Sequence, residues 1–462
     1  MTVFSIPIRP VAPNRPAPSL TFTTFTVDRV IYSILDATTV SVTNFDTLDV
    51  TPWNLTLTST VQDPNTHITY NVISIDPFAF INCSFLLTIT IPDSITSIGG
   101  SSFTFCNNLT AVTFTGTSTI PSIESYTFYG CSSLTTIVIP NSVTSIGDAA
   151  FLECFSLPSI NIPNSVLYLG VSSFNSCGSL ATVTFGPSSL ITIINDSTFY
   201  GCNILTNIVN FPPLITRIEN NAFRESGLIS IVISNLVTYI GVYAFLYCYS
   251  LTSVTFAPTS TIATIDSSAF AGTPIVSMTI PKSVTTLAAG VFGSCQNLST
   301  VTFETPSQIT TLNDSMFNNN FSLETIVIPD SVTTINNGAF VNCYILKNIT
   351  MNNNVTSIAS NCFDGCLLIK YISPPPGPPY LGTLYTNSLQ GQYVYDYFLP
   401  PGTNNLYLNY VNTNPPIPQT CFLRTVNLGA ISGKGSSTRI FNFCKKTSGS
   451  FYCLSTFNCN CK

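Results

Sequence analysis

Cysteine is the residue type in this chain with the greatest capacity for chemistry, because a thiol can bind a soft metal or form a disulfide. The chain holds sixteen cysteines among 462 residues. Some copies of a recurring Phe-x-x-Cys segment carry Ser226, Thr273 or Asn320 instead of cysteine, and none of these can replace a thiolate. The segment therefore predicts small buried side chains rather than ligands. Ten cysteines occupy it: Cys83, Cys106, Cys131, Cys154, Cys177, Cys202, Cys248, Cys295, Cys343 and Cys366.

A second group of five cysteines lies in the last 42 residues: Cys421, Cys444, Cys453, Cys459 and Cys461. So dense a group in a short segment favours disulfide bonds formed in an oxidising compartment. A zinc site is the alternative, although Cys459-Asn-Cys461 lacks the usual Cys-x-x-Cys spacing and no histidine is nearby. Because five is odd, one thiol is left for Cys362, for a second chain, or for none.

Residues that support catalysis are scarce. His67 is the only histidine, so any Ser-His or Cys-His arrangement would have to use it. Its alternating surroundings predict an exposed strand position. Acids that precede several phenylalanines could attract calcium, but capping of a helical turn requires the same residue types. They are Glu124, Asp148, Asp196, Glu219, Asp266 and Asp314. With no phosphate loop or zinc-protease motif, we expect no enzyme, no metal and no cofactor.

Phenylalanine recurs thirteen times at intervals of 22 to 25 residues, and this repetition must position everything else. A unit of this length cannot bury its own apolar side, so neighbouring units must stack and share one continuous core. The sequence therefore predicts a mainly β repeat solenoid of about thirteen units. The repeated residues are Phe80, Phe103, Phe128, Phe151, Phe174, Phe199, Phe223, Phe245, Phe270, Phe292, Phe317, Phe340 and Phe363.

Within each unit, apolar residues alternate in two short runs, as in Ile137-Val-Ile139 and Val143-Thr-Ser-Ile146. Alternation over short runs bounded by Pro, Asn and Gly is typical of strands. The Phe-x-x-Cys segment has helical spacing but is too short for more than a turn or two. We therefore predict strand, turn, short strand, turn and helical turn in every unit.

The outward residue of the first strand forms a column of mostly Thr and Val. Stacked at about 4.8 Å per unit, such a column makes a flat ladder of hydroxyl and methyl groups. Exposed strands favour these β-branched residues on structural grounds alone, and a contact surface for a protein or a glycan is the functional interpretation. The candidate ladder comprises Thr90, Thr113, Val138, Thr184, Val232, Thr255, Thr279, Thr302, Val327 and Thr350.

The run Leu-Thr-Thr-Ile-Val-Ile-Pro-Asn-Ser-Val-Thr-Ser-Ile-Gly-Asp-Ala-Ala-Phe at 134–151 resembles the BspA-like leucine-rich repeat. The segments 31–42 and 67–75 are similar to the segment that precedes the first repeat in that family, and residues 375–410 to its degenerate last unit. The resemblance implies a right-handed leucine-rich-repeat superhelix used for surface display, adhesion and protein binding. It carries no catalytic residue over to this chain.

These patterns divide the chain into five parts. A proline-rich arm covers 1–27, a β-rich N-terminal cap 28–75, the repeats 76–371, a degenerate last unit 372–415, and a basic, cysteine-rich tail 416–462. Proline keeps the first part extended.

Charge is rare, at 7% of residues, and is unevenly distributed. The residues after Asp396 include no acid and carry +6; since the whole chain carries −6, the residues before them carry −12. Both ends could be solvated arms, or the tail could dock on the acidic body of another copy. The candidate docking charges are Arg424, Arg439, Lys445 and Lys446. The overall acidity argues against nucleic acid as a partner.

Two functional hypotheses follow. One is a surface module that binds a host or matrix protein, with a glycan as an alternative ligand. The other is a structural protein whose copies associate into a homo-oligomer, as part of a filament, an appendage or a virus particle. No apolar stretch is long enough to span a membrane, and prolines interrupt any signal-like run at the N-terminus. We therefore expect an extracellular or particle surface, reached without a recognisable signal peptide.

Overall fold

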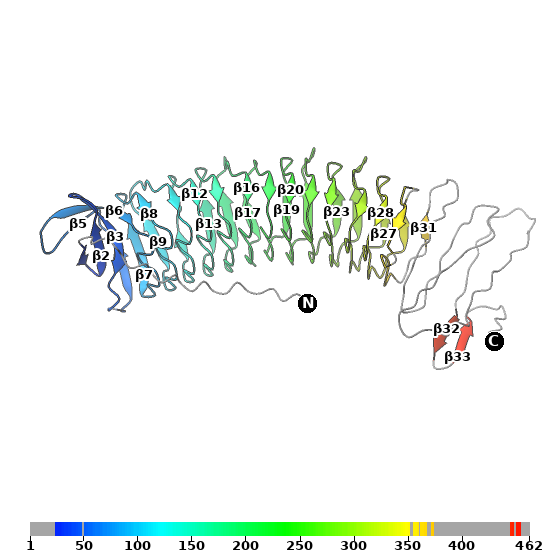
Figure 1. The fold of residues 1–462 in the computed structure, drawn as a ribbon, viewed down its shortest axis with the longest axis horizontal. Helices are drawn as coiled ribbons and strands as arrows, with labels where there is room; N and C mark the ends of the chain where they lie inside the picture. Colours follow the sequence, from blue (N-terminus) through cyan, green and yellow to red (C-terminus); the bar gives the residue numbers. More distant parts are fainter. Residues whose placement is uncertain are drawn as a thin grey trace, which may run out of the picture.

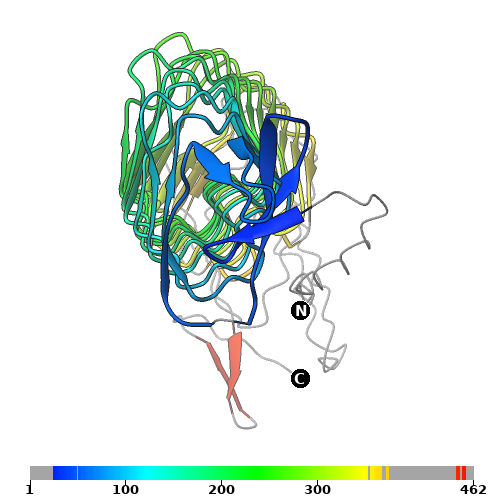
Figure 2. The same cartoon turned by 90° about the vertical axis from the view of Figure 1, so that its left-hand side faces the viewer.

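The computed structural model describes residues 24–48, 50–351, 354–359, 361–366, 371–373, 444–447 and 450–453. The repeats form an elongated solenoid in which each unit is one rung (Figure 1). Seen from the N-terminal end, the rungs superimpose into an oval (Figure 2). The mainly β solenoid that the sequence predicts is confirmed.

Two sets of parallel strands run along the solenoid. The first-strand ladder consists of β7 (Leu86–Ile91), β9 (Ala111–Phe114), β11 (Thr136–Ile137), β13 (Ser159–Ile162), β15 (Thr182–Phe185), β17 (Asn207–Val209), β19 (Ser230–Ile233), β21 (Ser253–Phe256), β23 (Ser277–Ile280), β25 (Thr300–Phe303), β27 (Thr325–Val327), β29 (Asn348–Thr350) and β31 (Tyr371–Ser373). Most strands of neighbouring rungs pair in register, as in Val232 opposite Thr255, and the pairing is interrupted between β11 and β13, β17 and β19, β21 and β23, and β25 and β27.

The second-strand ladder consists of two-residue strands, each with its second side chain directed inward. They are β8 (Ser97–Ile98), β10 (Ser122–Ile123), β12 (Ser145–Ile146), β14 (Tyr168–Leu169), β16 (Ile193–Ile194), β18 (Arg217–Ile218), β20 (Tyr239–Ile240), β22 (Thr264–Ile265), β24 (Thr286–Leu287), β26 (Thr311–Leu312), β28 (Thr334–Ile335) and β30 (Ser357–Ile358).

An N-terminal cap closes the first rung. Its strands are β1 (Thr24–Val27), β2 (Val30–Ile34), β3 (Thr39–Phe45), β4 (Trp53–Thr56), β5 (Thr60–Gln62) and β6 (Thr69–Ile75). β6 pairs with β8 and β4 pairs with β7, both in parallel, so the cap continues both ladders. The first strands of both ladders, β7 and β8, are therefore paired with the cap and do not form the end of a sheet, and β4 becomes the edge strand beside β7.

The Phe-x-x-Cys segments are not helical, which corrects the predicted helical turn. Among the described residues there is no helix, and each segment is a row of tight turns. The residue two positions after each repeated phenylalanine has a left-handed φ in every rung, from Asn82 (60°) to Gly365 (78°). A left-handed residue ends an α-helix, so the i, i+3 spacing of Phe and Cys is met by successive turns instead. We call this side of the solenoid the turn face.

The turns of neighbouring rungs are hydrogen-bonded to each other. The Phe103 amide donates to the carbonyl of Thr127 at 2.9 Å, and the Phe128 amide donates to Ala150 at 2.8 Å. The intervening amides bond within their own turn, as Cys106 does to Phe103 at 3.1 Å. The backbone of the turn face is thereby satisfied without a helix.

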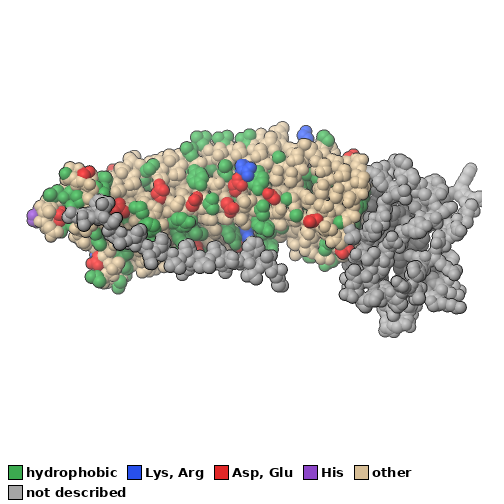
Figure 3. Space-filling model, viewed as in Figure 1, with side chains coloured by type: hydrophobic (Ala, Val, Ile, Leu, Met, Phe, Trp, Pro, Cys, Tyr) green, Lys and Arg blue, Asp and Glu red, His purple; other side chains and the backbone are tan. Residues whose placement is uncertain are grey.

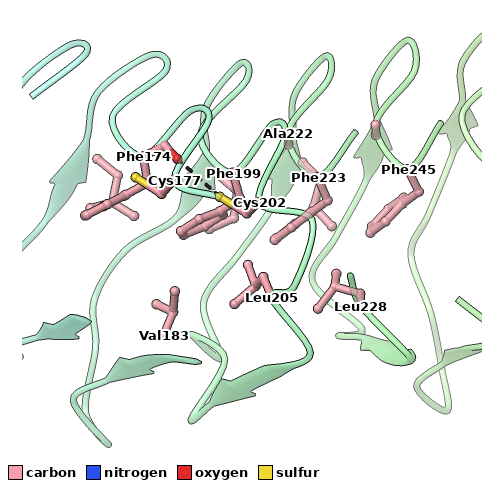
Figure 4. Close-up of a cluster of buried hydrophobic side chains, with 14 of the residues drawn as sticks. Phe174, Cys177, Val183, Phe199, Cys202, Leu205, Ala222, Phe223, Leu228 and Phe245 are labelled. Carbon is pink, nitrogen blue, oxygen red and sulfur yellow. Dashed lines mark hydrogen bonds between the residues drawn. The ribbon is translucent and has the colours of Figure 1, made fainter. Parts of the chain in front are cut away.

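The repeated phenylalanines stack into one column through the core. Consecutive rings from Phe80 to Phe363 lie 5.2 to 5.9 Å apart with interplanar angles of 2° to 20°. Phe45 of the cap continues the column, 6.0 Å from Phe80. Figure 4 shows a section of this core, with the rings of four successive rungs side by side. Such stacking stabilises the rungs beyond the area that they bury.

The cysteine column lies beside these rings, and the prediction of small buried side chains is confirmed. Each thiol from the second rung onward donates to the carbonyl of the phenylalanine one rung earlier, as Cys202 does to Phe174 at 3.2 Å (Figure 4). Burial raises the pKa of Cys202 to about 12. The described cysteines from Cys83 to Cys366 form no disulfide. A protonated, hydrogen-bonded thiol in an apolar core is inert, so these cysteines are structural.

Candidate functional site

The predicted contact ladder lies along the outside of the first-strand ladder. Registered pairs include Thr90 with Thr113 and Thr279 with Thr302. Most of the column is exposed to solvent, whereas Thr90 and Thr184 are half-buried. The valines are the most exposed apolar side chains of the column, at 71% for Val138 directly after β11, 64% for Val232 and 63% for Val327. The structure thus brings these residues into one row along the solenoid, in which Asn161 and Val209 fill the two remaining positions.

This face carries no charge. The strands from β7 to β29 of the first-strand ladder contain no Asp, Glu, Lys, Arg or His. Elsewhere on the described surface charges are few and scattered, as Figure 3 shows for one side of the molecule. A surface without charge loses less hydration free energy when a partner covers it. The first-strand face is therefore suited to being buried against another molecule.

The hydroxyl groups of the contact ladder are free of structural hydrogen bonds to the described residues. Threonines in neighbouring columns differ, because they bond the backbone of the preceding rung. Thr110 donates to the carbonyl of Leu87 at 2.9 Å, and Thr144 donates to Pro121 at 3.0 Å. The threonines of those columns therefore have a structural role, because they link neighbouring rungs by hydrogen bonds. The hydroxyls of the contact ladder remain available to a partner.

The second-strand ladder contains a patch that the sequence analysis missed. Most of its outward residues are Ser or Thr, but four consecutive rungs present Tyr168, Ile193, Arg217 and Tyr239. The Arg217 guanidinium lies 4.1 Å from the centre of the Tyr239 ring and forms an ion pair with Glu219. That ion pair raises the pKa of the guanidinium. Departure from the Thr-Ser pattern is the signal that could have found this patch.

Two members of the acidic column, Asp148 and Asp314, hold turns of neighbouring rungs together. Asp148 accepts a hydrogen bond from the Val171 amide at 2.8 Å, and Asp314 accepts one from Asn337 at 3.0 Å. The capped turn therefore belongs to the next rung, and it is not the predicted helical one. In the described parts of the chain, no three His, Cys, Asp or Glu side chains are grouped closely enough to hold a metal ion.

His67 is exposed, as expected, but it lies in the turn before β6 and not in a strand. The Asp63 carboxylate accepts hydrogen bonds from the Asn65 amide and the Thr66 hydroxyl and so tightens this turn. The chain leaves the turn through His67 with a left-handed φ of 59°. The strand prediction failed because the alternating pattern begins only at Thr69.

Most of the predicted tail site lies outside the described residues. Cys421, Arg424, Arg439, Cys459 and Cys461 belong to that part. The remaining members lie on the hairpin of β32 (Cys444–Thr447) and β33 (Ser450–Cys453), which includes Lys445 and Lys446. Its antiparallel register places Cys444 opposite Cys453.

Comparison with known proteins gives the same architecture. A family model described as the BspA type leucine rich repeat region matches residues 60–181, 172–299 and 263–383. A leucine-rich repeat protein from Bacteroides ovatus ATCC 8483 is similar at 24% identity with a TM-score of 0.55, over 75% of this chain and 94% of that one.

A leucine rich cell surface protein from Faecalibacterium prausnitzii A2-165 is similar at 24% identity with a TM-score of 0.48, over 78% and 97% of the two chains. The search of curated proteins found no match. No helix among the described residues has the length and apolar character needed to cross a bilayer.

Proposed function

The chain belongs to the BspA-type leucine-rich repeat family, and from this premise we propose that it is a non-enzymatic, surface-displayed module that binds a protein partner through its first-strand face. The similar protein from Faecalibacterium prausnitzii is described as a cell surface protein, which supports display on an exterior. The observation that carries the proposal is the uncharged, mostly exposed column of mainly Thr and Val side chains on the strands from β7 to β29.

The face has the composition and size of a protein contact. The cores of protein interfaces are depleted of charged residues, and the exposed Val138, Val232 and Val327 supply apolar area. With strands about 4.8 Å apart and a rise of about 3.3 Å per residue, the face measures roughly 50 Å by 13 Å. Its area of about 650 Å² is close to the roughly 800 Å² that each partner contributes to a standard interface.

An array of purified extracellular-matrix and serum proteins tests the proposal. The face variant carries Thr255→Lys, Thr279→Lys and Thr302→Lys. Its matched control carries Thr264→Lys, Thr286→Lys and Thr311→Lys on the second-strand ladder of the same rungs. We expect the wild-type chain and the control to retain the same array protein and the face variant to lose it, because three ammonium groups would be desolvated. Retention by the face variant, or no retention by any chain, would contradict the proposal.

Self-assembly is the second candidate, and the separation of charge along the chain favours it. The part up to Asp396 carries −12 and the remainder +6, so the tail of one copy complements the body of the next. Negative-stain imaging at micromolar concentration in low and high salt tests this. Oligomers that dissociate in high salt would support it, and separate elongated monomers in both conditions would exclude it.

A further inference from the structure

The turn face has an open groove of about 420 Å³ that runs across five rungs, from Arg224 to Asn318. Its shape follows from side-chain size. In the column one residue after the repeated phenylalanine, Arg224 and Leu246 are followed by Ala271 and Gly293, and then by Asn318. The large side chains of Arg224 and Leu246 thus form one wall of the groove. Ala271 and Gly293 form its floor, and the Asn318 amide forms the far wall.

The tall wall is built from aromatic rings and one arginine. The Arg224 guanidinium lies between the rings of Tyr200 and Tyr243, at 5.1 and 5.8 Å, and its Nε is 3.2 Å from the Glu225 carboxylate. The Arg224 side chain is only 20% exposed, so these contacts fix it in place. The ion pair leaves this wall electrically neutral overall.

A second aromatic pair stands beside this wall. The ring of Tyr247 lies 5.6 Å from that of Tyr249 at an angle of 14°, and the two residues are 40% and 71% exposed. A second hollow of about 280 Å³ lies against Tyr247 and Tyr249 and includes Asn203. Tyr247 lines both hollows, so a single ligand that extends from one hollow into the other would contact this ring.

Glycines keep the floor open. A Cβ on Gly272 would lie 2.5 Å from the Tyr247 ring, and a Cβ on Gly293 would lie 2.4 Å from the Asn318 side-chain oxygen. Gly290 has a left-handed φ of 66°. Any side chain at these positions would occupy space that the groove needs or displace one of its walls.

The backbone of the floor is already paired. The Gly272 amide donates to the Gly293 carbonyl at 2.8 Å, and the Ser294 amide donates to Asn318 at 2.7 Å. A ligand must therefore bond to side chains, chiefly the Ser268 and Ser315 hydroxyls and the Asn318 amide. An extended peptide, which is recognised largely through its main chain at an open strand edge, would find no such edge here.

We propose that this groove binds a neutral oligosaccharide. A sugar ring presents an apolar face of C–H groups, which fits the exposed rings of Tyr247 and Tyr249, and a rim of hydroxyls, which fits the serine and asparagine side chains. A concave site with aromatic walls and a few placed polar groups is the usual form of a small-ligand site. The proposal is independent of the first-strand face, because the two lie on different sides of each rung.

Saturation-transfer NMR of the full chain with maltotriose, cellotriose and chitotriose tests the proposal. Ala271→Tyr should fill the groove, and it should fold because Tyr129 and Tyr200 occupy the same column in other rungs. Asn175→Tyr introduces the same side chain in that column away from the groove. Tyr247→Ser removes the ring that lines both hollows, and Ser176 and Ser294 occupy its column with the same left-handed φ.

We expect at least one of these sugars to bind the wild type and Asn175→Tyr equally. Ala271→Tyr should abolish the signal, and Tyr247→Ser should weaken affinity by roughly tenfold. No signal with any of the three sugars, or equal binding by Ala271→Tyr, would overturn the proposal. Binding of a phage-displayed peptide that Ala271→Tyr abolishes, with no sugar bound, would assign the groove to peptides and would also overturn it.

Discussion

Thr279 on β23 lies directly opposite Thr302 on β25, and both side chains are exposed on the uncharged face of the first-strand ladder. Their inward neighbours Met278 and Val301 are buried in the core. Alternate side chains of one short strand thus have different roles: the inward ones stabilise the core, and the outward ones form the exposed surface. Inward residues repeat because each rung must pack on the next, whereas outward residues are free to serve a partner.

The buried Asn320 should be the weakest point of the cysteine column. Its Nδ2 and Oδ1 atoms have no hydrogen-bond partner among the described residues, and its side chain is fully buried. In other rungs a thiol at this position bonds the preceding phenylalanine carbonyl, as Cys343 does to Phe317 at 3.1 Å. Asn320→Cys should therefore raise the free energy of unfolding by about 1–3 kcal/mol, measured by urea titration.

Thr273→Cys is the control for that substitution. The Thr273 hydroxyl already donates to the Phe270 carbonyl at 2.7 Å, so this change should stabilise far less. If Asn320→Cys left the unfolding midpoint unchanged, the bond from the thiol to the carbonyl would not be what maintains the column.

Removal of one ring from the phenylalanine stack should be costly. Phe199 is fully buried between Phe174 and Phe223, at 5.7 and 5.4 Å. Phe199→Ala should lower the free energy of unfolding by about 3–5 kcal/mol. Phe155→Ala, at a phenylalanine that is 47% exposed, should cost far less. Equal losses from the two changes in thermal melts would contradict the assigned core.

The buried thiols should make the protein sensitive to alkali. Burial raises the pKa of Cys202 and of Cys248 from 9.0 to about 12. Their folded-state pKa is above the unfolded one, so their contribution to stability is complete below about pH 9 and is lost as pH rises toward 12. Each such thiol should lower the free energy of unfolding by about 1.4 kcal/mol per pH unit in that window.

Urea titrations at pH 8 and pH 10 measure this effect. Cys202→Ser should reduce the pH dependence of the free energy of unfolding by the contribution of one thiol. The variant should fold because Ser226 occupies the same column. An unfolding midpoint that is the same at both pH values in the wild type would show that the thiols are not desolvated.

A disulfide should link Cys444 to Cys453. The two residues face each other in the antiparallel register of β32 and β33. Opposed residues in such a pair have Cα atoms about 4.5–5.5 Å apart, which lies within the range of disulfides. Peptide mapping without reductant should recover Cys444 and Cys453 in one linked fragment. Alkylation of both residues in the purified, unreduced protein would refute the link.

The repeat period and the division into inward and outward residues could be predicted from the sequence, because the alternation of Ile137, Val138 and Ile139 fixes which side chain packs inward. The conformation of the turns could not. Phenylalanine and cysteine three residues apart are compatible with both a helix and a turn, and the left-handed residues between them include Glu153 and Tyr247, which carry no such signal. Gly130 and Gly201 in that column were the available hint.

The two candidate binding surfaces also differ in how far the sequence predicts them. The first-strand column follows from alternation alone, whereas the groove depends on side-chain sizes in columns that only the turn geometry brings together. The repeat consensus describes only the residues that the rungs share. Tyr247 and Arg217 indicate individual surface sites because they differ from the residues that most rungs carry in their columns.

We expect the first-strand face, and not the second-strand ladder, to bind the partner. Thr279 and Thr286 belong to the same rung, are the same residue type and are both exposed, but they lie on different ladders. The decisive measurement is the equilibrium affinity of Thr279→Arg and of Thr286→Arg for an array protein that the wild-type chain retains. We expect a loss of at least roughly tenfold for Thr279→Arg and wild-type affinity for Thr286→Arg. Equal affinities, or a loss confined to Thr286→Arg, would contradict it.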